Sequence, residues 1–168
     1  QGLMLKGYPA DNTGQVQPGL AVPLQMPTAG IAPQATTSLM LEANLDATKP
    51  VTVNSAAPLV NFADADTYSG TTSLTVYDAK GTPVALTFYF QRASVYSEAD
   101  GTDNQWNVYM TANGRTIAGA DDAPDPVYTL VFPGDGSAPT DPVDPIAVDI
   151  PELANSLGVT SLPIAGLS

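Results

Sequence analysis

Apolar and polar residues alternate along much of this chain. In the stretch TTSLMLEANLD, which begins at Thr36, every second side chain is apolar. The apolar positions are Leu39, Leu41, Ala43 and Leu45, and the positions between them are Met40, Glu42, Asn44 and Asp46. Successive side chains of a β-strand point to opposite faces, so a period of two is typical of a strand with one buried face. We therefore predict a half-buried strand from Thr36 to Asp46.

The same alternation appears twice in TTSLTVYDAKGTPVALTFYFQR. The residues expected to face the interior are Leu74 and Val76 in the first run, and Val84, Leu86, Phe88 and Phe90 in the second. Asp78-Ala79-Lys80-Gly81 separates the two runs. Gly81 can adopt the positive φ that a short hairpin loop requires, and the Asp78 carboxylate can accept hydrogen bonds from the backbone N–H groups of the turn. This stretch predicts a β-hairpin.

Three further strands are predicted from the alternation of apolar residues and from turn residues. NQWNVYMTANGRT places Trp106, Val108 and Met110 on one face and ends in Asn113-Gly114, which is among the strongest short turn signals. Additional strands are predicted at Val127–Phe132 and Ile146–Ile150. We expect Phe88, Phe90 and Trp106 to belong to the core.

Helices are expected to be rare, because 16 Pro and 14 Gly leave few uninterrupted windows of helical length. Two short exceptions are predicted. DADTYSG forms a single turn capped by Asp64, and IPELANSLG forms a short helix from Pro151 to Gly158, with proline at its start and glycine past its end. The predicted fold class is all-β, an antiparallel β-sandwich or barrel-like domain with long Pro/Gly-rich loops.

Patterning also differs along the chain. Residues 1–34 contain five prolines and little alternation after Leu5, which indicates an extended connector lying on another surface. Residues 35–132 hold the clear strands, and PGDGSAPTDPVDP at 133–145 predicts an exposed, acidic, Pro-rich loop. Gln1 to Leu5 lacks the features of a secretion signal, and the last residues are apolar, so we expect an excised piece of a longer protein.

Composition excludes several classes of partner and of chemistry. Five Lys and Arg oppose 17 Asp and Glu, a net charge of −12, so nucleic acid and anionic membrane surfaces would be repelled. The chain has no Cys and no His, which removes thiol nucleophiles, disulfides and imidazole chemistry. An enzyme is the weakest interpretation. We predict no catalytic, cofactor-binding or metal-binding residues, and no cofactor.

Two acidic segments still raise the question of a calcium site. Glu98–Asn104 and Asp121–Pro126 concentrate oxygen ligands around turns, as hard cations require. Their spacing matches no EF-hand loop, so solvated turns are the favoured interpretation. Paired carboxylates can also hydrolyse glycosides, but no two carboxylates are shown by the sequence to face each other.

Tyr77, Tyr89 and Tyr109 occupy the opposite phase of their strands and are expected near one another on the outer face. Such a face could stack on sugar rings or on a neighbouring protein, or could simply form stabilising cross-strand pairs. One alternative function is therefore an extracellular carbohydrate-binding β-sandwich module with calcium in an acidic loop.

Several motifs, taken in order, resemble the middle region of the bacterial flagellar hook protein family. LMLKGYPADNTGQVQPG leads through a Pro-rich connector to an alternating strand, a D-x-x-x-Y-like segment, a hairpin and a tryptophan strand. The matching positions are Thr36-Thr37, Asn44-Leu45-Asp46, Asp66-Thr67-Tyr68, Thr75-Val76-Tyr77-Asp78, Gly81 and Trp106 to Tyr109. The resemblance covers residues 1–132 well and the remainder loosely. Thr82-Pro83-Val84 departs from the family's Asn-x-His, which alters only the hairpin loop.

The resemblance implies a non-enzymatic structural subunit of the flagellar hook, the flexible joint that transmits torque from motor to filament. It implies export by the flagellar type III system and an extracellular position. Residues 1–34 would belong to the edge of the inner hook β domain and 35–168 to the outer one, with the terminal polymerisation helices lacking. The expected partners are other copies of the subunit and the adjacent axial, cap and junction proteins. The fragment itself is expected to be monomeric.

Overall fold

The computed structural model describes residues 5–19, 21–23, 32–53, 60–135, 137–142 and 144–168. The chain divides into two compact units, Gln1–Ala32 and Pro33–Ser168. In the first unit, β1 (Lys6–Gly7) pairs antiparallel with β2 (Val22–Pro23). The Asp11 carboxylate closes a turn between them by accepting hydrogen bonds from the backbone N–H groups of Thr13 and Gln15. This unit is therefore a small hairpin.

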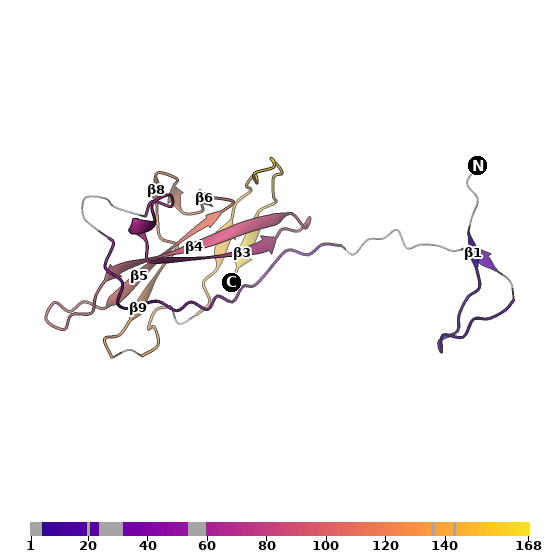
Figure 1. Ribbon diagram of the computed structural model, residues 1–168, viewed down its shortest axis with the longest axis horizontal. Coiled ribbons are helices and arrows are strands. Elements are labelled where there is room, and N and C mark those ends of the chain that lie inside the picture. The colour runs from indigo at the N-terminus through magenta and orange to yellow at the C-terminus, as the bar shows by residue number, and fades with distance from the viewer. Residues whose placement is uncertain (1–4, 20, 24–31, 54–59, 136, 143) are drawn as a thin grey trace. The chain divides into compact units, whose positions relative to one another are not determined.

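The second unit is built on one antiparallel sheet. Its strands are β3 (Gly70–Tyr77), β4 (Pro83–Ser94), β5 (Asn104–Ala112), β6 (Arg115–Thr116) and β9 (Tyr128–Phe132). β3, β4 and β5 are neighbours in that order, and the far edge of β5 pairs with β9 along its first half and with β6 at its end (Figure 1). The predicted all-β antiparallel fold is confirmed.

Local turn chemistry explains how the strands reverse. Gly81 has φ +79° in the β3–β4 turn, and Asn113 and Gly114 have φ +50° and +82° in the β5–β6 turn. Both are conformations that glycine, and to a lesser degree asparagine, adopt at low cost. The two predicted hairpin turns are confirmed, as are the strands at 127–132 and 146–150, the latter limited to β10 (Val148–Ile150).

A smaller layer covers one face of the sheet. β10 pairs with β11 (Ile164–Leu167), and their apolar side chains pack on the inward residues of β3, β4 and β5. The core residues are Val76, Val84, Leu86, Phe88, Phe90, Trp106, Val108, Met110, Ala112, Ile150, Ile164 and Leu167. The arrangement is a sandwich, because the described strands form no closed barrel. The expected core positions of Phe88, Phe90 and Trp106 are confirmed.

The opposite face of the sheet is also partly covered. A single 3₁₀ turn, η1 (Ala65–Thr67), is capped by Asp64, whose carboxylate accepts a hydrogen bond from the Asp66 N–H, as predicted. The Thr67 carbonyl next to it accepts a hydrogen bond from the Gln91 side chain of β4. A short hairpin of β7 (Gly119–Ala120) and β8 (Ala123–Pro124) completes the unit. Among the described residues, no helix has the length and apolar character needed to cross a membrane.

The strand predicted from Thr36 to Asp46 is wrong as a hydrogen-bonded strand. The segment is extended, but its backbone bonds to the rest of the unit only near its start, where the Thr36 N–H donates to the Tyr77 carbonyl and the Leu39 N–H to the Ser168 carbonyl. The alternation is nevertheless preserved, since Leu39, Leu41, Ala43 and Leu45 all line one groove. The alternation of apolar and polar residues thus reflects burial of one side of an extended segment that does not pair with a neighbouring strand.

The helix predicted from Pro151 to Gly158 is also wrong. Ala154 instead pairs with Thr160 across a tight turn, and the Asn155 carboxamide oxygen accepts hydrogen bonds from the N–H groups of Leu157 and Val159, each at 3.0 Å. Gly158 has φ +75° within this turn. The Asn155 side chain accepts hydrogen bonds from N–H groups that would otherwise be bonded within a helix, so the turn forms in place of the predicted helix.

Candidate functional site

Asp78 is a buried carboxylate at the junction of two hairpins. Its Oδ1 accepts hydrogen bonds from the backbone N–H groups of Lys80 (2.8 Å) and Thr82 (2.7 Å), and its Oδ2 accepts one from Leu162 (2.7 Å). The first two bonds confirm the predicted role in the β3–β4 turn. The third joins that turn to the segment between β10 and β11, and nothing local in the sequence indicates it.

Burial raises the pKa of Asp78, but the hydrogen bonds from Leu162, Thr82 and Lys80 together outweigh it and leave this pKa below its ordinary value. Hydrogen bonds to the charged form lower a carboxyl pKa because the proton would displace them. Asp78 is therefore ionised, and its carboxylate joins the β3–β4 turn to the segment before β11 by accepting hydrogen bonds from backbone N–H groups of both.

Arg92 is the second charged group in the interior. Its guanidinium Nη1 donates hydrogen bonds to the carbonyls of Ala47 and Lys49, both at 2.6 Å, and Nη2 donates to the Asn104 side chain at 3.1 Å. The guanidinium carbon lies 5.9 Å from the centroid of the Trp106 ring. Arg92 lies two positions after Phe90, on the same buried face of β4. A charged residue at a position of the core face could have indicated a buried polar contact, but the sequence analysis did not consider it.

The predicted outer tyrosine face is not present. Tyr89 and Tyr109 are cross-strand partners, but Tyr109 is buried and donates a hydrogen bond to the Gln91 side chain at 3.1 Å. The ring centroids of Phe62 and Tyr68 lie 4.6 Å and 5.1 Å from that of Tyr89.

Tyr77 pairs with Pro83 at the opposite end of β3, so the three tyrosines do not gather. The segment around η1 covers the face that the sequence left open, and no flat tyrosine platform for a sugar ring results.

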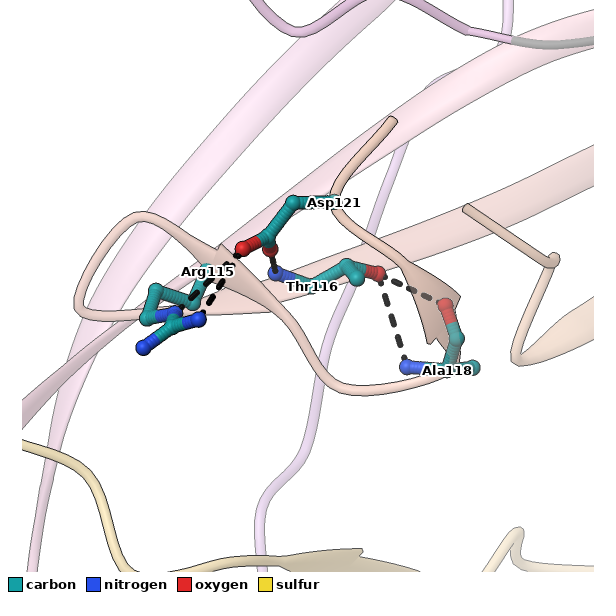
Figure 2. Close-up of polar contacts among 4 residues, drawn as sticks. All are labelled: Arg115, Thr116, Ala118 and Asp121. Carbon is teal, nitrogen blue, oxygen red and sulfur yellow. Dashed lines mark hydrogen bonds and ion pairs between the residues drawn. The ribbon is translucent and has the colours of Figure 1, made fainter. Parts of the chain in front are cut away.

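The acidic segments form turns. In Glu98–Asn104, Ser97 pairs with Thr102, and the Asp100 carboxylate accepts a hydrogen bond from the Ser97 hydroxyl. In the second segment, Asp121 bonds to the Arg115 guanidinium and to the Thr116 N–H, and the Thr116 hydroxyl contacts Ala118 (Figure 2). Within the described ranges, no three or more acidic side chains converge as metal ligands would. Asp121 serves to close the loop after β6.

An apolar groove of about 410 Å³ lies within the second unit. Its walls are the segment 39–45, the inward residues of β4 and β5, strand β9, and the side chains of Pro139, Pro145 and Ile146. Leu41 is 36% exposed at its rim. The segment 39–45, which lacks strand partners, thus forms one wall of this groove.

Taken together, these features define an antiparallel β domain whose buried polar groups hold turns and layers in place and whose main hollow is apolar. This is the class of an antiparallel β-sandwich domain. The chain belongs to the family described as the flagellar basal body protein FlaE D2 domain, which matches residues 44–165.

Individual relatives agree with this family. The chain is 34% identical over 111 residues to the flagellar hook protein FlgE of Salmonella typhimurium (strain LT2), and equally to that of Salmonella typhi. The corresponding protein of Escherichia coli (strain K12) is 31% identical over 111 residues. In each case the alignment covers 65% of this chain and 25% of the relative, so the chain spans about a quarter of the length of the curated relatives it matches.

Proposed function

We propose that this chain is part of a structural subunit of the bacterial flagellar hook, the flexible joint that transmits torque from the motor to the filament. The observation that carries the proposal is the family match over residues 44–165, together with relatives that are flagellar hook proteins. Residues 35–168 form the outer β domain and residues 1–34 the edge of an inner one, with 133–145 as an exposed loop. No catalytic step belongs to this function.

The chemistry of the chain suits this role. A chain without cysteine can pass unfolded through the flagellar type III export channel and function outside the cell without forming stray disulfides. Buried links such as Asp78 and Arg92 keep the domain's shape while neighbouring subunits move. The partners are further copies of the subunit and the adjacent axial, cap and junction proteins of the flagellum.

Immunogold electron microscopy tests the proposal directly. Fab fragments raised against this chain are applied to flagella isolated from the organism that encodes it. Gold is expected on the short curved segment between basal body and filament, and absent when the Fab is first mixed with excess chain. Gold confined to the filament or the cell body would overturn the proposal.

The isolated chain is expected to be monomeric at micromolar concentration. Its net charge of −12 makes copies repel at long range, and contacts that slide during rotation are small and polar. Sedimentation velocity across a concentration series checks this. A concentration-independent dimer would contradict it.

A further inference from the structure

The second unit begins with an extended segment, residues 36–46, which we call the entry strap. At its start, the Thr36 N–H donates a hydrogen bond to the Tyr77 carbonyl at 2.9 Å, and the Leu39 N–H donates one to the Ser168 carbonyl at 2.8 Å. Figure 1 shows the C-terminus beside this part of the strap. The first attachment of the strap is therefore a short set of hydrogen bonds to the last residue of β3 and to Ser168.

Along the rest of its length, the strap is held by side chains. Leu39 and Leu45 pack against the core, while Leu41 is 36% exposed. Among the described residues, no backbone hydrogen bond joins 40–46 to the sheet. The strands β3 and β4, in contrast, are paired at eight positions. The strap is therefore bound more weakly than the strands beside it.

Arg92 of β4 forms a second attachment, directly after the strap. Its Nη1 donates hydrogen bonds to the carbonyls of Ala47 and Lys49, both at 2.6 Å, and its own carbonyl accepts one from the Thr52 N–H at 3.2 Å. The Arg92 side chain is buried, and a buried charged donor that loses its acceptors costs more than a hydrogen bond lost at the surface. The chain is therefore fixed to β4 more firmly at residue 47 than at residue 36.

We propose that tension between residue 34 and Ser168 peels the entry strap from the sheet, that peeling stops where Arg92 holds the chain, and that the strap rebinds when the tension falls. Tension entering at residue 34 reaches the bonds of Thr36 and Leu39 one after another, whereas each strand of the sheet is held by a whole ladder. The eleven residues of the strap have an extended length of roughly 40 Å, at about 3.6 Å per residue.

The apolar groove supplies the force for rebinding. The strap forms one of its walls, so peeling uncovers the apolar side chains of the groove and of the strap together. Their return from water is favourable, which makes the closed state the stable one without load. The biological setting rests on the proposed function: in a joint that bends as it turns, the strap lengthens the chain that enters the second unit and spares the core.

Single-molecule force spectroscopy tests the proposal on the full chain. Because the chain contains no cysteine, Gln34→Cys and Ser168→Cys give two unique attachment points for DNA handles, both at exposed positions. In an optical trap we expect a reversible first step that releases roughly 40 Å of chain, at a lower force than the unfolding of the remaining unit. A single all-or-none unfolding event, with no separate first step, would overturn the proposal.

Leu45→Ala and Leu74→Ala are a matched pair of variants. Both leucines are partly buried against the same core, but only Leu45 belongs to the strap, and Leu74 lies on β3 outside the groove. Leu45→Ala is expected to shift the opening equilibrium at a given force about tenfold toward the open state, with the length of the step unchanged. Leu74→Ala is expected to leave the first step as it is and to lower the force of the later unfolding. Equal effects of the two variants on the first step would contradict a separate strap.

Arg92→Lys tests where the peeling stops. A lysine ammonium does not reproduce the forked contacts of the guanidinium with the Ala47 and Lys49 carbonyls, so the first step is expected to lengthen beyond roughly 40 Å. An unchanged length would refute Arg92 as the stop. Native circular dichroism is required of this variant, and the leucine pair tests the strap without it.

The force measurement and the immunogold labelling separate this inference from the proposed function. Gold on the hook without a first step refutes the strap alone. A reversible first step without gold on the hook refutes the hook assignment and retains the strap as a property of the fold.

Discussion

Asp78 and Arg92 carry charge into the interior of the unit Pro33–Ser168, and each is bonded to the backbone of a distant segment. Asp78 binds Leu162, 84 positions further along the chain, and Arg92 binds the carbonyls of Ala47 and Lys49. Hydrogen bonds to charged groups are stronger than neutral ones, and a buried donor or acceptor left without its partner is costly. Single side chains therefore connect segments that strand pairing does not join.

Replacing Asp78 with Asn is expected to lower the thermal midpoint at pH 7 by about 5 °C or more, because the amide nitrogen cannot accept a hydrogen bond: the bond from Leu162, or those from Lys80 and Thr82, is lost, and the remainder become neutral. The pKa of Asp78 in the folded chain lies below its ordinary value of 3.8, so its contribution to stability is full above that value and is lost as the pH falls through the folded pKa. The difference between Asp78→Asn and the natural chain should therefore shrink below pH 3.8. Differential scanning calorimetry against pH measures it, with Asp122→Asn on the exposed loop as control. A difference that is constant across pH would refute this account.

Gly119, the first residue of β7, leaves no room for a side chain. It has φ +74°, and a Cβ there would lie 2.5 Å from the Ala123 carbonyl oxygen and 2.6 Å from the Asp125 nitrogen. Gly119→Ala should lower the free energy of unfolding by about 1–3 kcal/mol. Gly70→Ala is the matched control, since a Cβ at Gly70 meets nothing within 4 Å. Urea denaturation compares them, and equal midpoints would contradict the strain at Gly119.

At the scale of elements, β9 is held by the loop that follows it as well as by β5. The Thr140 N–H donates to the Val131 carbonyl, and the Tyr128 hydroxyl donates to the Asp141 carboxylate at 2.6 Å. The loop, composed largely of Pro, Gly and Asp, returns to the strand at these two points. A stretch that reads as low-complexity in sequence is thus attached to the sheet edge.

The Tyr128–Asp141 bond predicts an altered phenol titration. The hydrogen bond to Asp141 raises the pKa of Tyr128 to about 12 from 10.0. Because the folded pKa is raised, the stabilising contribution is present below 10.0 and is lost as the pH rises toward about 12.

Asp141→Asn should shift this titration toward 10.0, as followed by phenolate absorbance, with Tyr128→Phe identifying the signal among 7 tyrosines. Asp144→Asn, in the same loop, is the control. Overlapping titration curves for Asp141→Asn and the natural chain would argue against the bond in solution.

At the scale of the whole molecule, the two units differ in what holds them. The unit Pro33–Ser168 has its own apolar core, to which the main sheet and β10–β11 both contribute. The unit Gln1–Ala32 contains two 2-residue strands and turn hydrogen bonds. Independent stability requires a core, so we assign it to the second unit.

A chain that begins at Pro33 is therefore expected to unfold in one cooperative transition, with a midpoint within about 3 °C of that of the full chain. Calorimetry of the two chains side by side measures this. A broad, non-cooperative transition in the shortened chain would show that the first unit is required for folding.

The sequence predicted well at two turns and on the core face of two strands, where the deciding preference is local, although the equally local Asn155 turn was missed. The β3–β4 and β5–β6 turns were correctly placed because Gly81 and Asn113-Gly114 bend the chain by their own backbone preferences. The core face of β4 and β5 followed from alternation. The hook-family resemblance was likewise carried by ordered motifs, and the family match confirmed it.

What the sequence by itself determined is the core face of β4 and β5 and the turns at Gly81 and Asn113-Gly114, since each follows from residues within a few positions of one another. The tertiary structure alone decided which backbone groups find partners. Residues 36–46 alternate like a strand but lack a neighbouring edge along most of their length, and Tyr109, on the phase expected to face outward, is buried. The Asp78–Leu162 link and the groove beside Leu41 arise from segments far apart in sequence, so no local pattern contains them.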